Sequence, residues 1–285
     1  MSNITYPTIP PHTLYKPTIS TPSPHSPVPE SSKSKPHHLK NGSGYTNPWE
    51  SWVEKSVPGM GLAMMRAKLT GNFPTPDTTP PTVPHQTPTF LPTRHSSPHL
   101  RATWLGHATY YLEYSSGLRV LFDPVFEDRC SPFTFLGPKR YTRPPPSTKG
   151  APSGAHGAYP RAGNPSGSAA TRGTRAVPPL PKDIDDYDDA YAHLPVCPAF
   201  REIGELRGPF DLGLVPIGAY EPRSIFSPMH ANPFDSVNIF LDTQCKRAMG
   251  IHWGTWVLTS EAVMEPPRLL RKALAWKGLP ETGVF

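Results

Sequence analysis

The chain has 285 residues and a formal net charge of +6, from 28 Lys and Arg against 22 Asp and Glu. Its 41 prolines are about three times the usual share. This content excludes one compact domain that fills the whole chain, because proline fits neither helix interiors nor central strands. The sequence also has no apolar run of about 18 residues, which excludes a membrane-spanning helix.

The cysteines and the N-terminus indicate the compartment. Cys130, Cys197 and Cys245 form no Cys-x-x-Cys pair, which argues against a disulfide framework or a thiolate zinc site and fits a reducing compartment. The first residues lack the apolar core of a secretory signal. We therefore expect a cytoplasmic protein, with mitochondrial targeting left open because no acidic residue precedes Glu30. The modest charge permits attraction to anionic lipid, and no nucleic-acid partner is expected.

The first hundred residues alternate between proline-rich and ordered segments. Residues 1–44 have the composition of a disordered tail. Residues 45–70 contain the helix-prone run MGLAMMRAKL, and residues 71–98 return to a Pro/Thr linker. The large apolar side chains of the second segment either form a lipid-facing edge or pack on the body of the protein: Trp49, Trp52, Met60, Met64 and Met65.

Strongly structured sequence begins at Arg101. The run ATWLGHATYYLEY predicts two short strands broken at Gly106, followed by a turn at residues 115–117 and a strand ending at Pro124. Order lapses again in residues 147–195. Gly, Ala, Pro, Ser and Arg dominate this segment, which ends in an acidic run that we interpret as a solvated linker: Asp183, Asp185, Asp186, Asp188 and Asp189 with His193.

After Cys197, predicted helices and strands alternate. A helix over 198–207 ends at Gly208, and a buried strand over 209–220 runs into a loop. Asn232 is a capping residue with proline at the next position, and Phe234, Val237 and Leu241 share one face of the helix that follows. The run KRAMGIHWGTW predicts a strand, and PPRLLRKALAWKGL an amphipathic helix that stops at Gly278. This alternation is typical of α/β layering.

Three polar residues stand at predicted strand ends, where α/β folds present ligands. They are His107 after Gly106, Asp123 before a proline, and His252 after the MGI run. Two imidazoles and a carboxylate form the ligand set of hydrolytic zinc sites. Spacing alone leaves open the alternative that each histidine is a hydrogen-bonded structural residue.

Longer segments carry a family resemblance. The block TWLGHATYYLEYSSGLRVLFDPVFEDRCSPFTFLGPKRYTRPPP resembles the opening of the N-acyl-phosphatidylethanolamine-hydrolysing phospholipase D family, a branch of the metallo-β-lactamase fold. NPWESW is similar to its N-terminal signature. CPAFREIGELRGPFDLGLVPIGAYEPR and HANPFDSVNIFLDTQCKRAMGIHWGTW are similar to its closing third.

The resemblance implies an αββα sandwich, two zinc ions and a water nucleophile. The implied reaction cleaves a phospholipid phosphodiester into an N-acylethanolamine and phosphatidic acid. The family's His-x-His-x-Asp-His motif has no counterpart, because no His-x-His occurs in the chain, and YAHLPVCPAF stands where a GDTGY-like turn is expected. Of the implied metal ligands only His252 lies in a matching motif, with His107 and Asp123 as metal-proximal candidates. No catalytic residue is identified.

Three further residues receive substrate-side roles by analogy. Tyr220 and Arg223 lie in the GAYEPR segment, and His230 lies in MHANP. Arg223 has two alternatives: bidentate pairing with a phosphate, or a structural ion pair with Asp or Glu. His230 either faces the substrate or makes a hydrogen bond where a helix begins.

Together these observations predict a partial metallo-β-lactamase αββα sandwich in two parts, residues 45–146 and 196–285. A low-complexity segment replaces the metal-binding centre between them. The expected function is a phospholipase D-like zinc hydrolase, impaired or inactive, acting on a phospholipid or at a membrane surface. The alternatives are a non-catalytic remnant with lipid affinity and an interaction protein with polyproline ligands. Missing central strands would expose edges, so we expect marginal stability.

Overall fold

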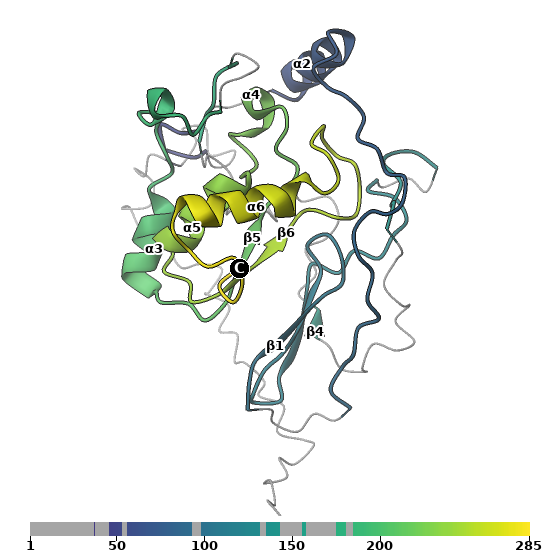
Figure 1. Ribbon diagram of the computed structural model, residues 1–285, viewed down its shortest axis with the longest axis vertical. Helices are drawn as coiled ribbons and strands as arrows, with labels where there is room; N and C mark the ends of the chain where they lie inside the picture. Colours follow the sequence, from purple (N-terminus) through teal and green to yellow (C-terminus); the bar gives the residue numbers. More distant parts are fainter. Residues whose placement is uncertain are drawn as a thin grey trace, which may run out of the picture.

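The computed structural model describes residues 37, 46–52, 56–92, 98–131, 135–142, 156–157, 175–180 and 185–285. Apart from His37, the predicted N-terminal tail lies outside the described residues. So does most of the segment 143–174. The described chain is a mixture of helices and two sheets (Figure 1). This confirms an α/β protein.

The first sheet contains the strands predicted around Gly106. β1 (Arg101–Trp104), β2 (Tyr110–Glu113) and β3 (Arg119–Phe122) are antiparallel neighbours, and β4 (His156–Gly157) pairs parallel with β3. Gly106, with φ 102°, makes the break between β1 and β2, a conformation that glycine adopts without steric cost. Gly117, with φ 82°, lies in the predicted turn before β3.

The second sheet contains two parallel strands, β5 (Gly213–Pro216) and β6 (Ala248–Ile251). Their register pairs Gly213 with Ala248 and Pro216 with Ile251. Because the strands are parallel, their carboxyl ends meet at one edge of the sheet. His252 therefore stands beside the loop that follows β5, as the sequence predicted for a strand delivering this histidine.

Helices α3 (Ala199–Arg207), α5 (Pro233–Asp242) and α6 (Glu265–Trp276) form a layer beside this sheet (Figure 1). α5 packs against α3, α6 and β5. Its N-terminus has a capping box, in which the Asn232 side chain accepts from the backbone N–H of Asp235 and the Asp235 carboxylate accepts from that of Asn232. The predicted cap is confirmed, and such boxes satisfy N–H groups that the helix leaves unpaired.

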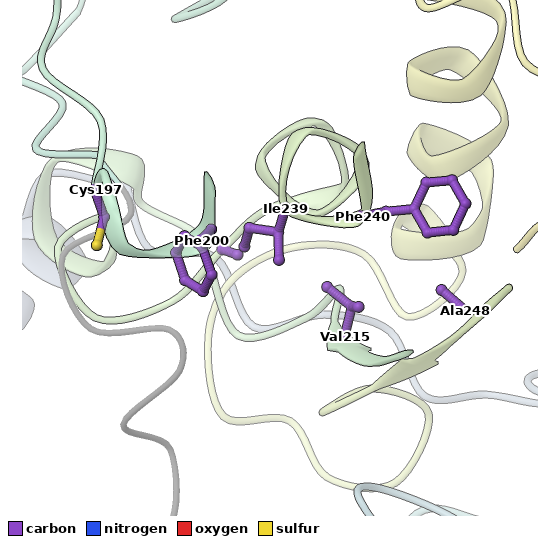
Figure 2. Close-up of a cluster of buried hydrophobic side chains, with 7 residues drawn as sticks. Cys197, Phe200, Val215, Ile239, Phe240 and Ala248 are labelled. Carbon is purple, nitrogen blue, oxygen red and sulfur yellow. The ribbon is translucent and has the colours of Figure 1, made fainter. Parts of the chain in front are cut away.

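The main hydrophobic cluster lies between this helical layer and the second sheet. Figure 2 shows Phe200 of α3, Val215 of β5 and Phe240 of α5 within it. Val237 is fully buried against α6, but Leu241 is 41% exposed. The predicted apolar face of α5 is therefore wrong at Leu241. Because α5 has neighbours on several sides, Ile239 and Phe240 are buried instead.

α2 (Val57–Leu69) confirms the helix predicted in the MGLAMMRAKL run, and it contacts the short helix α4 (Arg223–Phe226). Trp49 packs against the main hydrophobic cluster, and Met60 and Met64 are half-buried. For these three residues the structure supports packing rather than a lipid-facing edge, whereas Met65 is exposed. Among the described helices, none combines the length and apolarity that crossing a bilayer requires.

Hydrogen bonds and ring contacts join the two predicted parts. The Tyr110 hydroxyl donates to the Gly250 carbonyl at 2.9 Å, and the His252 N–H donates to the His107 carbonyl at 3.1 Å. The rings of Trp104 and Trp253 stack with centroids 4.9 Å apart. The end of β1 therefore lies directly against the end of β6, although the two are far apart in the sequence.

The end of the low-complexity segment belongs to the packed body. Arg175, Val177 and Asp186 are each about 95% buried, and the Val177 N–H donates to the Ser227 hydroxyl at 2.9 Å. The prediction of a solvated acidic linker is thus wrong for Asp186, because this carboxylate forms an ion pair with the buried Arg223. The amino-acid composition of a segment cannot predict an ion pair with a residue that is distant in the sequence.

Candidate functional site

Three histidines meet where the two sheets join. His107 follows β1, His252 follows β6, and His230 precedes α5. The ring centroids of His107 and His252 are 5.2 Å apart, and those of His230 and His252 are 6.1 Å apart. The sequence selected His107 and His252 as strand-end residues and His230 by analogy with the family, and the structure brings the three into one cluster, called the histidine cluster below.

The backbone is strained at three of the selected positions. His107, Asp123 and His252 have φ values of 49°, 39° and 65°. Non-glycine residues adopt this left-handed region at a cost of about 1–3 kcal/mol, and such residues concentrate at functional sites. Tertiary contacts hold the strain at His107, whose N–H donates to the Thr255 hydroxyl at 2.8 Å. The strain points to the same three strand ends that the sequence selected.

Burial keeps the three imidazoles neutral. It lowers the pKa of His230 to about 4. Burial lowers the pKa of His107 to about 4, with smaller contributions from repulsion by the Arg140 cation and by His230 in its protonated form. Burial and the other two histidines lower the pKa of His252 to about 3. The Nδ1 atoms of His230 and His252 are buried, and neither has a hydrogen-bond partner among the residues that the structure describes. Unpaired buried polar atoms of this kind are rare in folded proteins.

Arg140 and Trp256 also belong to this site, although the sequence analysis did not single them out. The Arg140 guanidinium lies 4.7 Å from the centre of the Trp256 ring, which contacts the His107 ring edge-on at 5.0 Å. Arg140 is 6% exposed and donates to the carbonyls of Val125 and Glu127 at 2.9 and 3.2 Å. Arg140 lies in the GPKRY motif and Trp256 in the IHWGTW motif. The family resemblance of these motifs is the sequence feature that could have identified both residues.

Asp123 ends β3 and is half-buried. Its carbonyl accepts a hydrogen bond from the Thr109 hydroxyl at 2.7 Å, which ties the strand end to β2. Burial raises the pKa of its carboxyl group. The strand end predicted from sequence is thus present, but the described contacts of Asp123 are to the first sheet and not to the histidine cluster.

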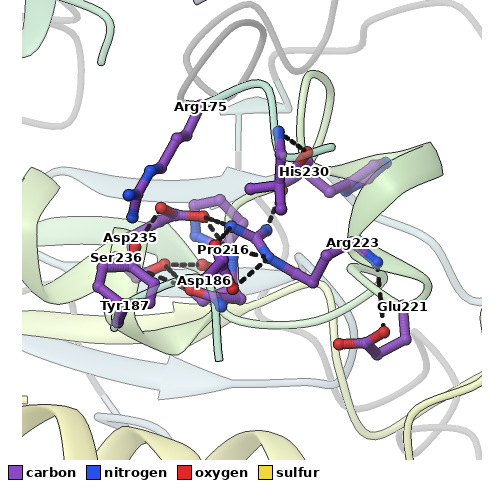
Figure 3. A network of polar contacts seen from close by, with 12 residues as sticks. Arg175, Asp186, Tyr187, Pro216, Glu221, Arg223, His230, Asp235 and Ser236 are labelled. Carbon is purple, nitrogen blue, oxygen red and sulfur yellow. Dashed lines mark hydrogen bonds and ion pairs between the residues drawn. The ribbon is translucent and has the colours of Figure 1, made fainter. Parts of the chain in front are cut away.

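Arg223 lies in a buried network next to the histidine cluster, and its Nη1 donates to the His230 carbonyl at 3.5 Å (Figure 3). Its Nη2 donates to the carboxylates of Asp186 and Asp235, each at 2.8 Å. The Tyr187 hydroxyl completes the network by bonding to Asp235. Burial alone would lower the pKa of Arg223, but the carboxylates of Asp235 and Asp186 raise it above its ordinary value. Of its two predicted alternatives, the structure shows the ion pair.

Tyr220 is a buried residue that links the loop after β5 to helix α6. It is 1% exposed, and its hydroxyl donates to the Glu265 carboxylate at 2.8 Å. The neighbouring Glu261 accepts from the backbone N–H of Ala219 at 2.7 Å and of Glu221 at 3.2 Å. Burial raises the pKa of Glu221 to about 7.

A small pocket lies beside His252. It is lined by residues of the loop after β5, by residues that follow β6, including Trp253, Trp256 and Glu261, and by Tyr141.

The donor set does not fit a two-zinc centre. Among the residues that the structure describes, no group of three or more His, Cys, Asp or Glu side chains is placed to hold a metal ion. The rings of His107 and His252 stack with an interplanar angle of 24°. A ligating nitrogen binds zinc in the plane of its ring at about 2.0–2.1 Å, so stacked rings present their faces to each other and not converging lone pairs.

Comparison with known proteins supports the family resemblance. No family model matches the chain. The chain is 28% identical over 254 residues to N-acyl-phosphatidylethanolamine-hydrolyzing phospholipase D 1 of Caenorhabditis elegans, covering 63% of this chain and 71% of that protein. An uncharacterized Mycobacterium tuberculosis protein is 28% identical over 252 residues, with 63% and 66% covered. The mitochondrial N-acyl-phosphatidylethanolamine-hydrolyzing phospholipase D of Saccharomyces cerevisiae is 36% identical over 70 residues, covering 25% and 15%. The chain is thus similar to relatives named N-acyl-phosphatidylethanolamine-hydrolyzing phospholipase D, in agreement with the resemblance read from its motifs.

Proposed function

We propose that the chain is a phospholipase D-like hydrolase of the N-acyl-phosphatidylethanolamine type by descent, and that an incomplete metal centre leaves it impaired or inactive. The observation that carries the proposal is the histidine cluster. His252, the one implied zinc ligand in a matching motif, stands at a strained strand end between two further imidazoles. The described side chains around it do not form a metal-binding group.

The length of the match supports this proposal. The match to the C. elegans protein runs over 254 residues, whereas 63% of this 285-residue chain is about 180 residues. About 70 residues of the relative therefore lie opposite gaps in this chain. A His-x-His motif is missing from the sequence as well. Both observations favour the loss of an internal, ligand-bearing portion.

We also propose that the two packed parts are remnants of one metallo-β-lactamase-like αββα sandwich with an implied zinc cofactor. Support comes from the two sheets, which meet at His107 and Trp253, and from the helical layer over the second sheet. The N-terminal part corresponds to residues 45–146. The C-terminal part, predicted as 196–285, includes buried residues from Arg175 onward.

The proposed location is peripheral, at a membrane that supplies phospholipid. The name of the yeast relative describes a mitochondrial protein, which is compatible with mitochondrial targeting of this chain. The alternative function is a non-catalytic remnant that keeps lipid affinity. An activity measurement separates residual hydrolysis from a complete loss of it, because only a chain that still hydrolyses the lipid releases an N-acylethanolamine.

The test uses the full chain with N-acyl-phosphatidylethanolamine dispersed in detergent, and it measures the released N-acylethanolamine with zinc added and with a chelator. We expect release at background level in both conditions. The variants His252→Gln and His193→Gln, the second at an exposed position, provide the matched pair. Chelator-sensitive release that His252→Gln abolishes and His193→Gln preserves would contradict the proposal.

A further inference from the structure

Helix α2 is apolar on two opposite faces. One face packs toward the body, since Met60, Ala63, Met64 and Ala67 are half-buried. The other face points outward: Leu62 is 62% exposed, Met65 55% and Leu69 81%. A helix that is apolar on all sides is normally buried, yet α2 lies at the periphery of the described fold (Figure 1). Within the part of the chain that the structure describes, nothing covers this outward apolar face.

The outward side chains form one continuous stripe. Leu62, Met65 and Leu69 have the spacing i, i+3 and i+7, which places them on the same side of a helix. Arg66 follows at about 40° on one side of the stripe, and Lys68 lies about 60° beyond the other side, at 100° per residue. Both are exposed and belong to the last turn.

The charges around the stripe have one sign. The helix sequence VPGMGLAMMRAKL contains two basic residues and no acidic one. A protein partner commonly presents charges of both signs, whereas an anionic membrane presents one sign over a whole surface. An apolar stripe bordered by cations is the pattern of a helix that lies in a lipid interface, and each such cation adds about 1 kcal/mol near an anionic leaflet.

We propose that α2 is the element that docks this chain on an anionic phospholipid surface, with Leu62, Met65 and Leu69 inserted between headgroups and with Arg66 and Lys68 on their phosphates. The inference rests on the proposed function for the class of lipid, and it does not require hydrolysis. It also revises the sequence expectation: Met60 and Met64 face the body, and two leucines take their place on the lipid side.

The test is co-sedimentation of the full chain with vesicles of phosphatidylcholine alone or of phosphatidylcholine with phosphatidic acid. We expect binding to the second kind, and a loss of about tenfold for each of Leu62→Gln and Leu69→Gln. The matched control is Leu206→Gln on α3, whose side chain is 73% exposed. It should leave vesicle binding unchanged.

A variant without the two cations measures the electrostatic contribution to vesicle binding. Changing Arg66 and Lys68 to Gln should weaken binding to the anionic vesicles by about fivefold for each cation and remove the preference over neutral vesicles. Equal binding by the wild type and the Leu69→Gln variant would overturn the proposal. So would a shift of the α2 variants from dimer to monomer without any change in vesicle binding, because it would assign the stripe to a second copy of the chain. Since hydrolysis is measured on detergent-dispersed lipid, either failure is distinct from failure of the proposed function.

Discussion

Two buried polar regions of the molecule differ in how their hydrogen-bonding groups are paired. The Arg223 network joins one guanidinium to two carboxylates, and a tyrosine hydroxyl completes it (Figure 3). The histidine cluster instead buries Nδ1 of His230 and of His252 without partners in the described part of the chain, beside backbone in the left-handed region. Satisfied networks make a fold rigid and specific, whereas unsatisfied groups and strain mark places retained for another reason.

The comparison separates a buried network with paired polar groups from a buried cluster with unpaired ones. The sequence predicted a substrate-side role for Arg223, Tyr220 and His230 alike, because all three lie in segments that resemble the family. Of these three residues, His230 alone has a buried side-chain atom with no partner among the described residues. Motif resemblance assigns the same role to all three residues. Whether their buried polar atoms have hydrogen-bond partners distinguishes His230 from the other two.

The largest expected effect is on the pH dependence of stability. The histidines have pKa values of about 4, 4 and 3 in the folded chain, against an ordinary 6.5. Between about pH 6.5 and 4 the unfolded chain binds more protons, so the free energy of unfolding falls as the pH falls through this window. We expect the urea midpoint, followed by tryptophan fluorescence, to drop steeply there and to stay level above pH 6.5.

Glu221 acts in the opposite direction, because burial raises its pKa to about 7 and protonation then stabilises the folded state as the pH falls. The measurement is therefore made in a Glu221→Gln background. Replacement of His230 by Leu should flatten the pH profile, while replacement of the exposed His193 should not. A midpoint independent of pH from 6.5 to 4 would show that the cluster is not buried and neutral.

The next effect breaks the satisfied network. Arg223→Met leaves Asp186 and Asp235 buried without their cation, so we expect a loss of about 3–5 kcal/mol in the free energy of unfolding. Arg201→Met is the matched control, because the Arg201 side chain is 69% exposed and pairs with Asp242 at 3.8 Å. That change should cost less than about 1 kcal/mol. Equal losses in urea titrations would mean that the ion pairs of Arg223 contribute no more to stability than an exposed ion pair does.

A glycine beside the histidine cluster should be the next most sensitive position. Gly254 has φ 70°, and a Cβ there would lie 2.7 Å from the Trp104 ring. Gly254→Ala therefore combines left-handed strain with overpacking, about 3 kcal/mol together. Gly71→Ala has the same kind of strain, with φ 73° and open space around the added methyl, and should lose about 1 kcal/mol. Thermal melts of the two variants check the difference, which would vanish if the two sheets did not meet at Trp104.

The smallest effect compares one tyrosine from each region. Tyr187→Phe removes a hydrogen bond to the charged Asp235, and Tyr110→Phe removes one to the neutral Gly250 carbonyl. Because hydrogen bonds to charged groups are the stronger, we expect losses of about 2 and about 1 kcal/mol. Urea titration of the pair measures both values, and the reverse order would contradict the assignment of Asp235 as an ionised partner.

Local patterns in the sequence predicted most of the elements. The break at Gly106, the cap at Asn232 and the strand before His252 each follow from one residue type in one local context. The burial of Asp186 could not be predicted in this way, because its partner Arg223 lies 37 residues away. The convergence of His107, His230 and His252 was likewise out of reach of local patterns, since it depends on how two sheets meet.

The most direct test of the central claim is the zinc content of the purified full chain, measured by elemental analysis after incubation with zinc and removal of unbound metal. The incomplete donor set around His252 predicts well under one bound zinc per chain. Two tightly held zinc ions per chain, lost together in the His252→Gln variant, would contradict the account.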